Sequence, residues 1–105
     1  MSAGLPESWM LVVNASVDTA VEDDWNRWYD EVHLPEIAEC PGFIEAARYV
    51  TADDGGQRHY QTIYRLESPE AIHTVEFSER RGWYQFDQHV NANVRLFQRT
   101  GATND

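Results

Sequence analysis

The segment Trp25–Ile37, WNRWYDEVHLPEI, combines a helical pattern with a residue that interrupts helices. Large apolar side chains recur there at helical spacing, with charged or polar residues between them; they are Trp25, Trp28, Tyr29 and Val32. Pro35 has no backbone N–H, and its ring clashes with the carbonyl four residues earlier, so we expect the helix to stop or kink near His33. Pro35 can then begin a short continuation that the following Cys-Pro-Gly sequence ends.

The residues before this helix predict its start and a preceding strand. Thr19 and Glu22 have the spacing of a capping box, in which the hydroxyl and the carboxylate satisfy free backbone amides at a helix start. Upstream, WMLVVNASV, Trp9–Val17, is rich in β-formers and too short for a stable helix. A strand leading into the helix is therefore expected.

Two further strands are expected after the helix. FIEAARYV, Phe43–Val50, and RHYQTIYRL, Arg58–Leu66, are separated by ADDGGQ, a typical hairpin sequence. The second segment alternates cleanly, which predicts that Tyr60 and Tyr64 share one face of the sheet. Apolar and aromatic residues nevertheless occur on both of its faces, so the second face also needs a partner.

The last part of the chain predicts a second helix and a fourth strand. Ser68, a proline and a glutamate give a cap, a first-position proline and an acid in the first turn. The helix is expected from about Pro69 toward Phe77, with a break before Gly82 and a further turn carrying Trp83–Phe86, before NVRLFQR forms the last strand. The order β-α-β-β-α-β predicts an α+β, ferredoxin-like fold, in which both helices cover one face of a four-stranded antiparallel sheet.

Length and charge narrow the classes of protein. The 105 residues predict one domain over residues 9–99, with polar tails at 1–8 and 100–105. A net charge of -10 disfavours binding to nucleic acid or an anionic membrane. A single cysteine, Cys40, allows no internal disulfide, and no apolar run is long enough for a signal peptide or a membrane span, so we expect a cytoplasmic protein.

Two longer segments together resemble a known superfamily. DDWNRWYDEVHLPEIAECPGFIEAARYV, followed by SPEAIHTVEFSERRGW, is similar to the dimeric α+β barrel superfamily and most of all to its EthD-like branch. In that branch W-Y-x-x-x-H-L-P precedes P-G-F and an A-R-R-Y strand; only one arginine of that pair, Arg48, is present here. The resemblance spans roughly residues 12–97. It implies a homodimer whose two sheets close face to face, with a pocket between sheet and helices in each subunit.

His33 is the leading candidate for catalysis. Tyr29 lies one helical turn earlier, and Asp30 is placed to bind one ring nitrogen and fix the tautomer. A phenol, an imidazole and a carboxylate together suit general acid–base catalysis. The alternative is that His33 only caps a broken helix. Asn14, a polar residue in an apolar strand, is the third candidate: it either polarises a substrate oxygen or binds the chain at the turn.

The candidate substrate-binding residues are mostly aromatic. A flat aromatic wall suits an apolar or aromatic substrate, although such residues more often form a core or a dimer interface. Arg48 either binds an anionic group or pairs with a helix carboxylate. The expected set is Trp25, Tyr64, Trp83, Phe86 and Arg48.

Three functions stay open at this point. No metal-binding motif and no phosphate-binding loop is present, so we expect neither a metal nor a cofactor. The first function is a cofactor-independent cyclase, isomerase, lyase or decarboxylase, acting by proton transfer on an aromatic carbonyl or phenolic compound. The second is a monooxygenase, either cofactor-free or haem-degrading; for haem, Asn14, Trp83 and His73 or His89 would be needed. The third is a non-catalytic ligand-binding or accessory dimer.

Overall fold

The computed structural model describes residues 8–51 and 55–100. Four strands and three α-helical segments form it in the expected order: β1 (Trp9–Val17), α1 (Glu22–Trp28), α2 (Leu34–Ala38), β2 (Phe43–Val50), β3 (Tyr60–Leu66), α3 (Val75–Arg80) and β4 (Val90–Gln98). Of the expected tails, only Ser8 and Thr100 are described, and residues 52–54 of the expected hairpin lie outside the description.

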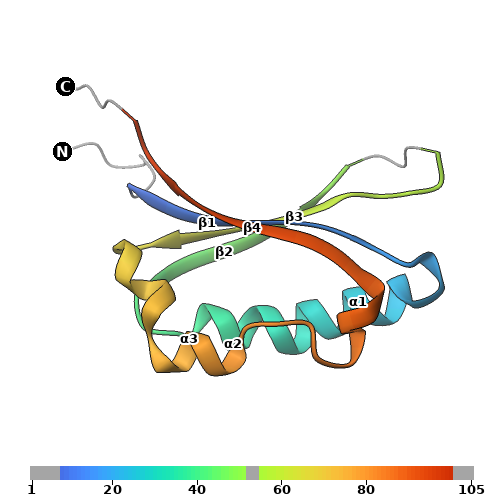
Figure 1. Cartoon of the computed structure of the whole chain (residues 1–105), viewed down its shortest axis with the longest axis horizontal. Helices are drawn as coiled ribbons and strands as arrows, with labels where there is room; N and C mark the ends of the chain where they lie inside the picture. The colour runs from blue at the N-terminus through green and yellow to red at the C-terminus, as the bar shows by residue number, and fades with distance from the viewer. Residues whose placement is uncertain (1–7, 52–54, 101–105) are drawn as a thin grey trace.

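The sheet confirms the ferredoxin-like prediction. Its strand order is β2-β3-β1-β4, and every neighbouring pair is antiparallel. The helices all lie on one side of the curved sheet, and the opposite side carries no helix (Figure 1). Side chains alternate between these sides, so β3 buries Tyr60, Thr62, Tyr64 and Leu66 beneath the helices.

The helix around Pro35 does not stop, which corrects one expectation. α1 and α2 are joined by a π-helical turn, Tyr29–His33, in which the backbone N–H of Leu34 donates to the carbonyl of Tyr29, five residues back. This wider turn accommodates the proline without breaking the helix. It also shifts the helical register, so Val32 is 50% exposed while His33 is buried. The expected place of Val32 on the apolar stripe is therefore wrong.

The second helical region is more broken than expected. Two 3₁₀ turns, Pro69–His73 and Tyr84–His89, flank the six-residue α3. Ser68 caps the first turn as predicted, because its hydroxyl accepts from the N–H of Glu70. Thr74, in an extended conformation, separates this turn from α3 and caps the helix through the N–H of Phe77 at 3.1 Å.

The capping box expected before α1 does not form. A 3₁₀ turn, Thr19–Val21, precedes α1. Neither Asp18, at the start of this turn, nor Val21, at the start of α1, makes a side-chain cap hydrogen bond. Glu22 is buried instead, where it accepts a hydrogen bond from the hydroxyl of Tyr60 and forms an ion pair with Arg58 at 3.3 Å. Its carboxylate therefore joins the start of α1 to β3 rather than capping the helix.

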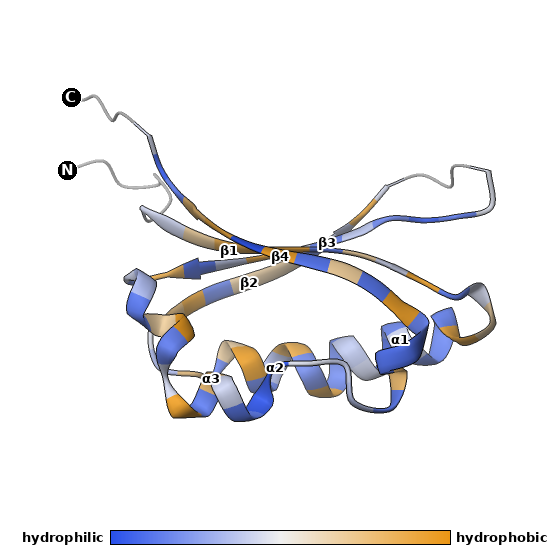
Figure 2. Ribbon diagram, viewed as in Figure 1, coloured by the Kyte–Doolittle hydropathy of each residue, from blue (hydrophilic) through white to orange (hydrophobic). Residues whose placement is uncertain are grey.

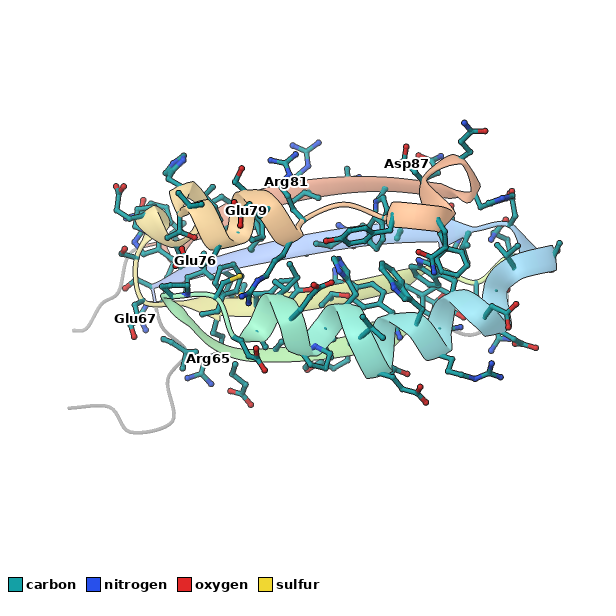
Figure 3. All side chains as sticks on the ribbon, turned by 90° about the horizontal axis from the view of Figure 1, so that it is seen from below. Arg65, Glu67, Glu76, Glu79, Arg81 and Asp87 are labelled. Carbon is teal, nitrogen blue, oxygen red and sulfur yellow. The ribbon has the colours of Figure 1, made fainter. Side chains whose placement is uncertain are left out.

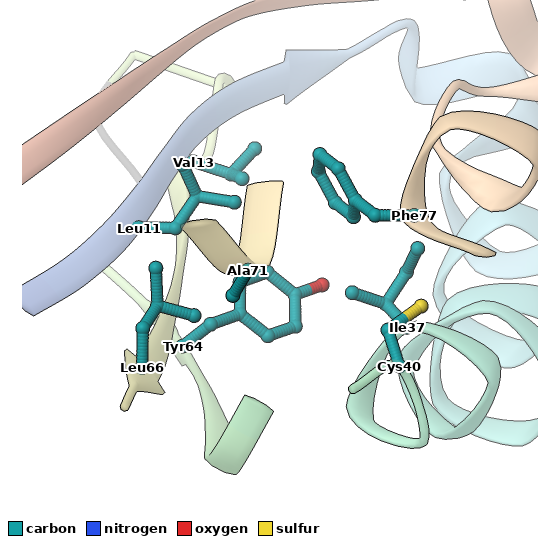
Figure 4. Packing of buried hydrophobic residues seen from close by; sticks show 8 residues of the cluster. All are labelled: Leu11, Val13, Ile37, Cys40, Tyr64, Leu66, Ala71 and Phe77. Atoms are coloured by element: carbon teal, nitrogen blue, oxygen red, sulfur yellow. The ribbon is translucent and has the colours of Figure 1, made fainter. Parts of the chain in front are cut away.

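Two clusters of buried side chains fill the space between helices and sheet. Along β4, hydrophobic and hydrophilic residues alternate, as a strand with one covered face requires (Figure 2). The first cluster (Figure 4) contains Leu11, Val13, Ile37, Cys40, Tyr64, Leu66, Ala71 and Phe77. The second contains Ala15, Val17, Trp25, Tyr29, Tyr60 and Phe86. Tyr29 and Tyr64 lie where the two clusters meet, since their hydroxyls contact each other.

The uncovered face of the sheet carries both apolar and amide side chains. Tyr49 is 55% exposed there and Phe97 45%. Between them, Asn14 accepts a hydrogen bond from Gln61 at 3.0 Å and donates one to Asn93 at 3.5 Å. These amides form a polar row across three strands, β3, β1 and β4, in the middle of the face.

We predict that this face joins two copies of the chain. Burial of its apolar side chains against a second sheet removes them from water. Light scattering at micromolar concentration should then give about twice the 12.1 kDa of one chain. Tyr49→Glu on this face should shift the mass toward the monomer, whereas Val75→Glu, at a 67% exposed position on α3, should not. A wild-type protein that stays monomeric contradicts the prediction.

Candidate functional site

A cavity of about 540 Å³ lies between the sheet and the helices. This volume is within the range of small-molecule sites. Its lining comes from strands β1, β3 and β4, from the π-helical turn and α2, and from the region around α3 up to β4: Leu11, Val13, Tyr29, His33, Ile37, Tyr64, Ile72, His73, Phe77, Arg81, Gly82, Trp83, Asp87 and Val94. The lining is mainly apolar, with a few polar groups at defined places.

His33 is buried in the wall of this cavity and held on two sides. Its side chain is 4% exposed, and its ring stacks on Trp28 with 4.7 Å between centroids and 12° between planes. Nδ1 lies 3.1 Å from Oε1 of Glu36. Asp30, the expected partner, is instead bound to Arg48 on β2, so that expectation is wrong.

The environment of His33 favours a neutral ring. Burial lowers the pKa of His33 below its ordinary value, and the hydrogen bond and charge of Glu36 oppose this only in part. A carboxylate can only accept, so Nδ1 carries the proton in the neutral ring and Nε2 keeps its lone pair. No side chain of residues 8–51 or 55–100 binds Nε2. The imidazole is thus arranged as a base beside the cavity.

Two phenols provide hydroxyl groups close to this base. The hydroxyl oxygens of Tyr29 and Tyr64 are 3.3 Å apart, and both rings line the cavity. Burial raises the pKa of Tyr29, against the lowering effects of hydrogen bonds from Thr62 and Tyr64. Burial also raises the pKa of Tyr64. Both groups therefore stay protonated and can donate hydrogen bonds to a substrate oxygen.

Arg48 fixes the helix to the sheet and is absent from the cavity wall. Its Nη1 and Nη2 each lie 2.7 Å from a helix side chain, Asp30 and Asn26 respectively. Its guanidinium carbon is 4.2 Å from the centre of the Tyr29 ring. The structure therefore contains the ion pair with a helix carboxylate, one of the two expectations for Arg48, and Arg48 lies outside the residues that line the cavity.

Three other candidates lie away from the cavity. Trp25 is fully buried in the second cluster, and Phe86 packs there too, so both belong to the core. Asn14 lies on the uncovered face, bonded to other amides, and therefore cannot act beside His33 in the same chain. The sequence contained a signal for this position of Asn14. Side chains of a strand point alternately to opposite faces, so Asn14 faces away from the side of Leu11 and Val13. Tyr64 and Trp83 do line the cavity with Tyr29 and His33.

The residues proposed for haem degradation do not come together. Asn14 is on the opposite side of the sheet from Trp83, which lines the cavity. His89 binds Asp18 through Nδ1 at 3.0 Å, at the start of β4. His73 alone of the two late histidines reaches the cavity wall. The described residues therefore provide no such set.

The sequence analysis did not identify Glu36, the partner of His33, or the cavity residues Arg81, Asp87 and Val94. Glu36 follows His33 by three positions, so helical spacing alone pointed to their contact. Arg81 and Asp87 had no comparable signal, because their positions depend on the break after α3 and the loop that follows. Val94 reaches the cavity because β4 is an edge strand with an incompletely covered inner face.

Two classes of feature are absent from residues 8–51 and 55–100. No group of three or more histidine, cysteine, aspartate or glutamate side chains is arranged to hold a metal ion. No helix within these ranges is long and apolar enough to span a membrane.

The four-stranded antiparallel sheet with its helices on one side is the ferredoxin-like fold that the sequence predicted. The chain belongs to the family described as "Domain of unknown function (DUF4286)", whose model matches residues 8–95. No curated protein matches the chain.

Solved structures support the fold assignment. SnoaB, a cofactor-independent oxygenase from Streptomyces nogalater, has a TM-score of 0.62 at 11% identity, over 93% of this chain and 99% of that one. A monooxygenase from the gene ActVA-Orf6 of Streptomyces coelicolor, in complex with the ligand nanaomycin D, has a TM-score of 0.58 at 18% identity, over 94% and 93%. An EthD family protein from Bacillus halodurans has a TM-score of 0.61 at 9% identity, over 83% and 96%. At these identities the likeness shows the fold alone.

Proposed function

We propose that the protein is a cofactor-independent enzyme that removes a proton from an aromatic carbonyl or phenolic compound. The observation that carries this proposal is the buried His33 ring, bound through Nδ1 to Glu36, in the wall of a cavity that is otherwise mainly apolar. A neutral base in a site shielded from water suits proton abstraction.

The reaction uses three groups of the site. Nε2 of His33 takes a proton from a C–H next to the carbonyl, or from a phenolic O–H, and the electron pair moves onto the substrate oxygen. A hydroxyl of Tyr29 or Tyr64 donates a hydrogen bond to this oxygen, where negative charge develops. Glu36 stabilises the imidazolium that forms. Return of the proton to another atom gives isomerisation; attack of the carbanion within the substrate gives cyclisation.

Oxygenation is the second candidate, and the structural likeness to a cofactor-independent oxygenase favours it. It shares the first step, proton removal by His33. The electron-rich anion then reduces molecular oxygen: one CH₂ group and one O₂ become one C=O group and one water. Molecular oxygen is the oxidant, and no bound group is required. The two candidates thus differ only after the anion has formed.

Anthrone tests the shared step and separates the two outcomes. Its CH₂ group lies opposite a carbonyl in a flat tricyclic compound, so its deprotonation gives a stabilised anion. In deuterated buffer without oxygen, the protein should accelerate exchange of the CH₂ hydrogens, followed by NMR. In air, formation of anthraquinone with one O₂ consumed identifies the oxygenase. Exchange no faster than in buffer, at anthrone concentrations that saturate the cavity, argues against the proposal.

The activity should depend on pH through His33. Burial lowers its pKa below the ordinary value of about 6.5. Because the neutral ring is the base, kcat/KM should rise with pH through this lowered pKa and be level by neutral pH. Glu36 opposes the lowering, so Glu36→Gln should move the rise to still lower pH. A rise centred above 6.5, unmoved by this substitution, contradicts the assignment.

A further inference from the structure

The cavity wall contains polar side chains that proton abstraction does not use. His73, Arg81 and Asp87 are exposed yet line the cavity, whereas Tyr29, His33 and Tyr64 are buried within it. The exposed polar side chains therefore lie at the mouth, and the base with its phenols lies at the inner end. A ligand that fills the cavity meets both sets at once.

Arg81 differs from most other arginines because no acidic side chain of the described residues pairs with it. The chain has eight arginines and no lysine, against 18 acidic residues. Four arginines form ion pairs: Arg27, Arg48, Arg58 and Arg65. Arg80 donates to the carbonyl of Glu36 at 3.0 Å. The Arg81 side chain forms no ion pair and no hydrogen bond with residues 8–51 or 55–100. It is the single arginine among the residues that line the cavity.

The backbone places Arg81 at the mouth. Its N–H donates to the carbonyl of Phe77 at 3.0 Å, which ends α3 at this residue. Gly82 follows with φ +113, a conformation that L side chains rarely adopt, and turns the chain toward Trp83. The position of Arg81 on the rim is thus set by a helix end and a glycine.

Asp87 gives the mouth of the cavity a negative charge opposite to that of Arg81. Arg81 and Asp87 lie at separate points along the connection between α3 and β4 (Figure 3). They form no ion pair with each other. An anionic group at the mouth is attracted by Arg81 and repelled by Asp87, so it takes one side of the opening.

We propose that the natural ligand carries a carboxylate at the end that stays at the mouth, where Arg81 binds it, while its aromatic part enters the cavity. Guanidinium groups match carboxylates in geometry and charge. An uncompensated cation at this place also offsets the repulsion between an anion and a protein of net charge -10. This inference rests on the proposed function, because it assumes that the cavity is the ligand site; it restricts the substrate to an aromatic acid.

The test compares two probes of equal ring size, 2-naphthoate and neutral 2-naphthalenemethanol, by calorimetry at low salt. The wild-type protein should bind 2-naphthoate more tightly. Arg81→Gln should weaken the affinity for 2-naphthoate about 3–10-fold, the range for an exposed charge contact. It should change the affinity for the alcohol by less than about 2-fold. Added salt should erase the preference of the wild-type protein. Arg95→Gln, on the uncovered face of the sheet, is the matched control and should change neither affinity.

Each result decides a different claim. The assignment of Arg81 as the carboxylate-binding residue is supported if Arg81→Gln loses affinity for 2-naphthoate, Arg95→Gln does not, and Asp87→Asn gains affinity. An unchanged 2-naphthoate affinity in Arg81→Gln, or an equal loss in Arg95→Gln, overturns it and leaves the proposed function standing if the alcohol still binds. Failure of the wild-type protein to bind either probe overturns both the assignment and the proposed function.

Discussion

Replacing His33 by glutamine should lower the turnover of a proton-transfer substrate by about 10²–10⁴-fold, the usual contribution of a general base. Glutamine has no basic nitrogen but keeps a polar side chain near Glu36. The loss of stacking on Trp28 should cost only about 1 kcal/mol of stability. Turnover of anthrone and thermal unfolding, measured on the same preparations, check both parts.

A second histidine provides the control. His59 is exposed, at the start of β3 and outside the cavity lining, so His59→Gln should leave turnover unchanged. If His33→Gln unfolds the protein, or if turnover per folded molecule matches the wild type, His33 is a packing residue and the catalytic assignment fails.

Gly42→Ala should destabilise the protein by about 2–4 kcal/mol, the sum of backbone strain and a close contact. Gly42 has φ +87, and a Cβ atom there would lie 2.8 Å from Cβ of Ala71. This position joins α2 to β2 beneath the 3₁₀ turn that begins at Pro69, where the first core cluster includes Ala71. Chemical denaturation gives the free energy of unfolding directly.

A substitution at Gly55 separates the effect of backbone strain from the effect of the close contact. It has φ +66 but nothing within 4 Å of an added Cβ atom, so Gly55→Ala should cost only about 1–2 kcal/mol from the backbone. Equal losses in the two variants show that the contact between Gly42 and Ala71 contributes nothing, which conflicts with the packing described here.

The fold could be predicted because its signals are local. The bounds of β1 were correct to the residue, and the alternation of β3 identified its buried face, since a strand has a fixed period of two. The break before Gly82 was expected, whereas the one at Thr74 was not, because it depends on an extended backbone conformation that the sequence pattern does not specify.

Part of the cavity lining could be expected from the sequence, for a related reason. Helical spacing placed Tyr29 and His33 together, and strand alternation placed Tyr64 on one face of the sheet. The π-helical turn was not foreseen, yet it decides that His33 faces inward and Val32 outward. Whether a large aromatic residue forms core or cavity depends on what packs around it, so the sequence did not distinguish Trp25, which lies in the core, from Trp83, which lines the cavity.

The state of the His33 ring tests the central claim most directly. Nitrogen NMR of the imidazole at about pH 7, where an ordinary histidine is mostly neutral, distinguishes the tautomers. We predict a neutral ring with the proton on Nδ1, and an Nε2 resonance that shifts when 2-naphthalenemethanol enters the cavity. A ring that carries its proton on Nε2, or an Nε2 resonance that saturating ligand leaves unmoved, would contradict the role of His33 as the base of this site.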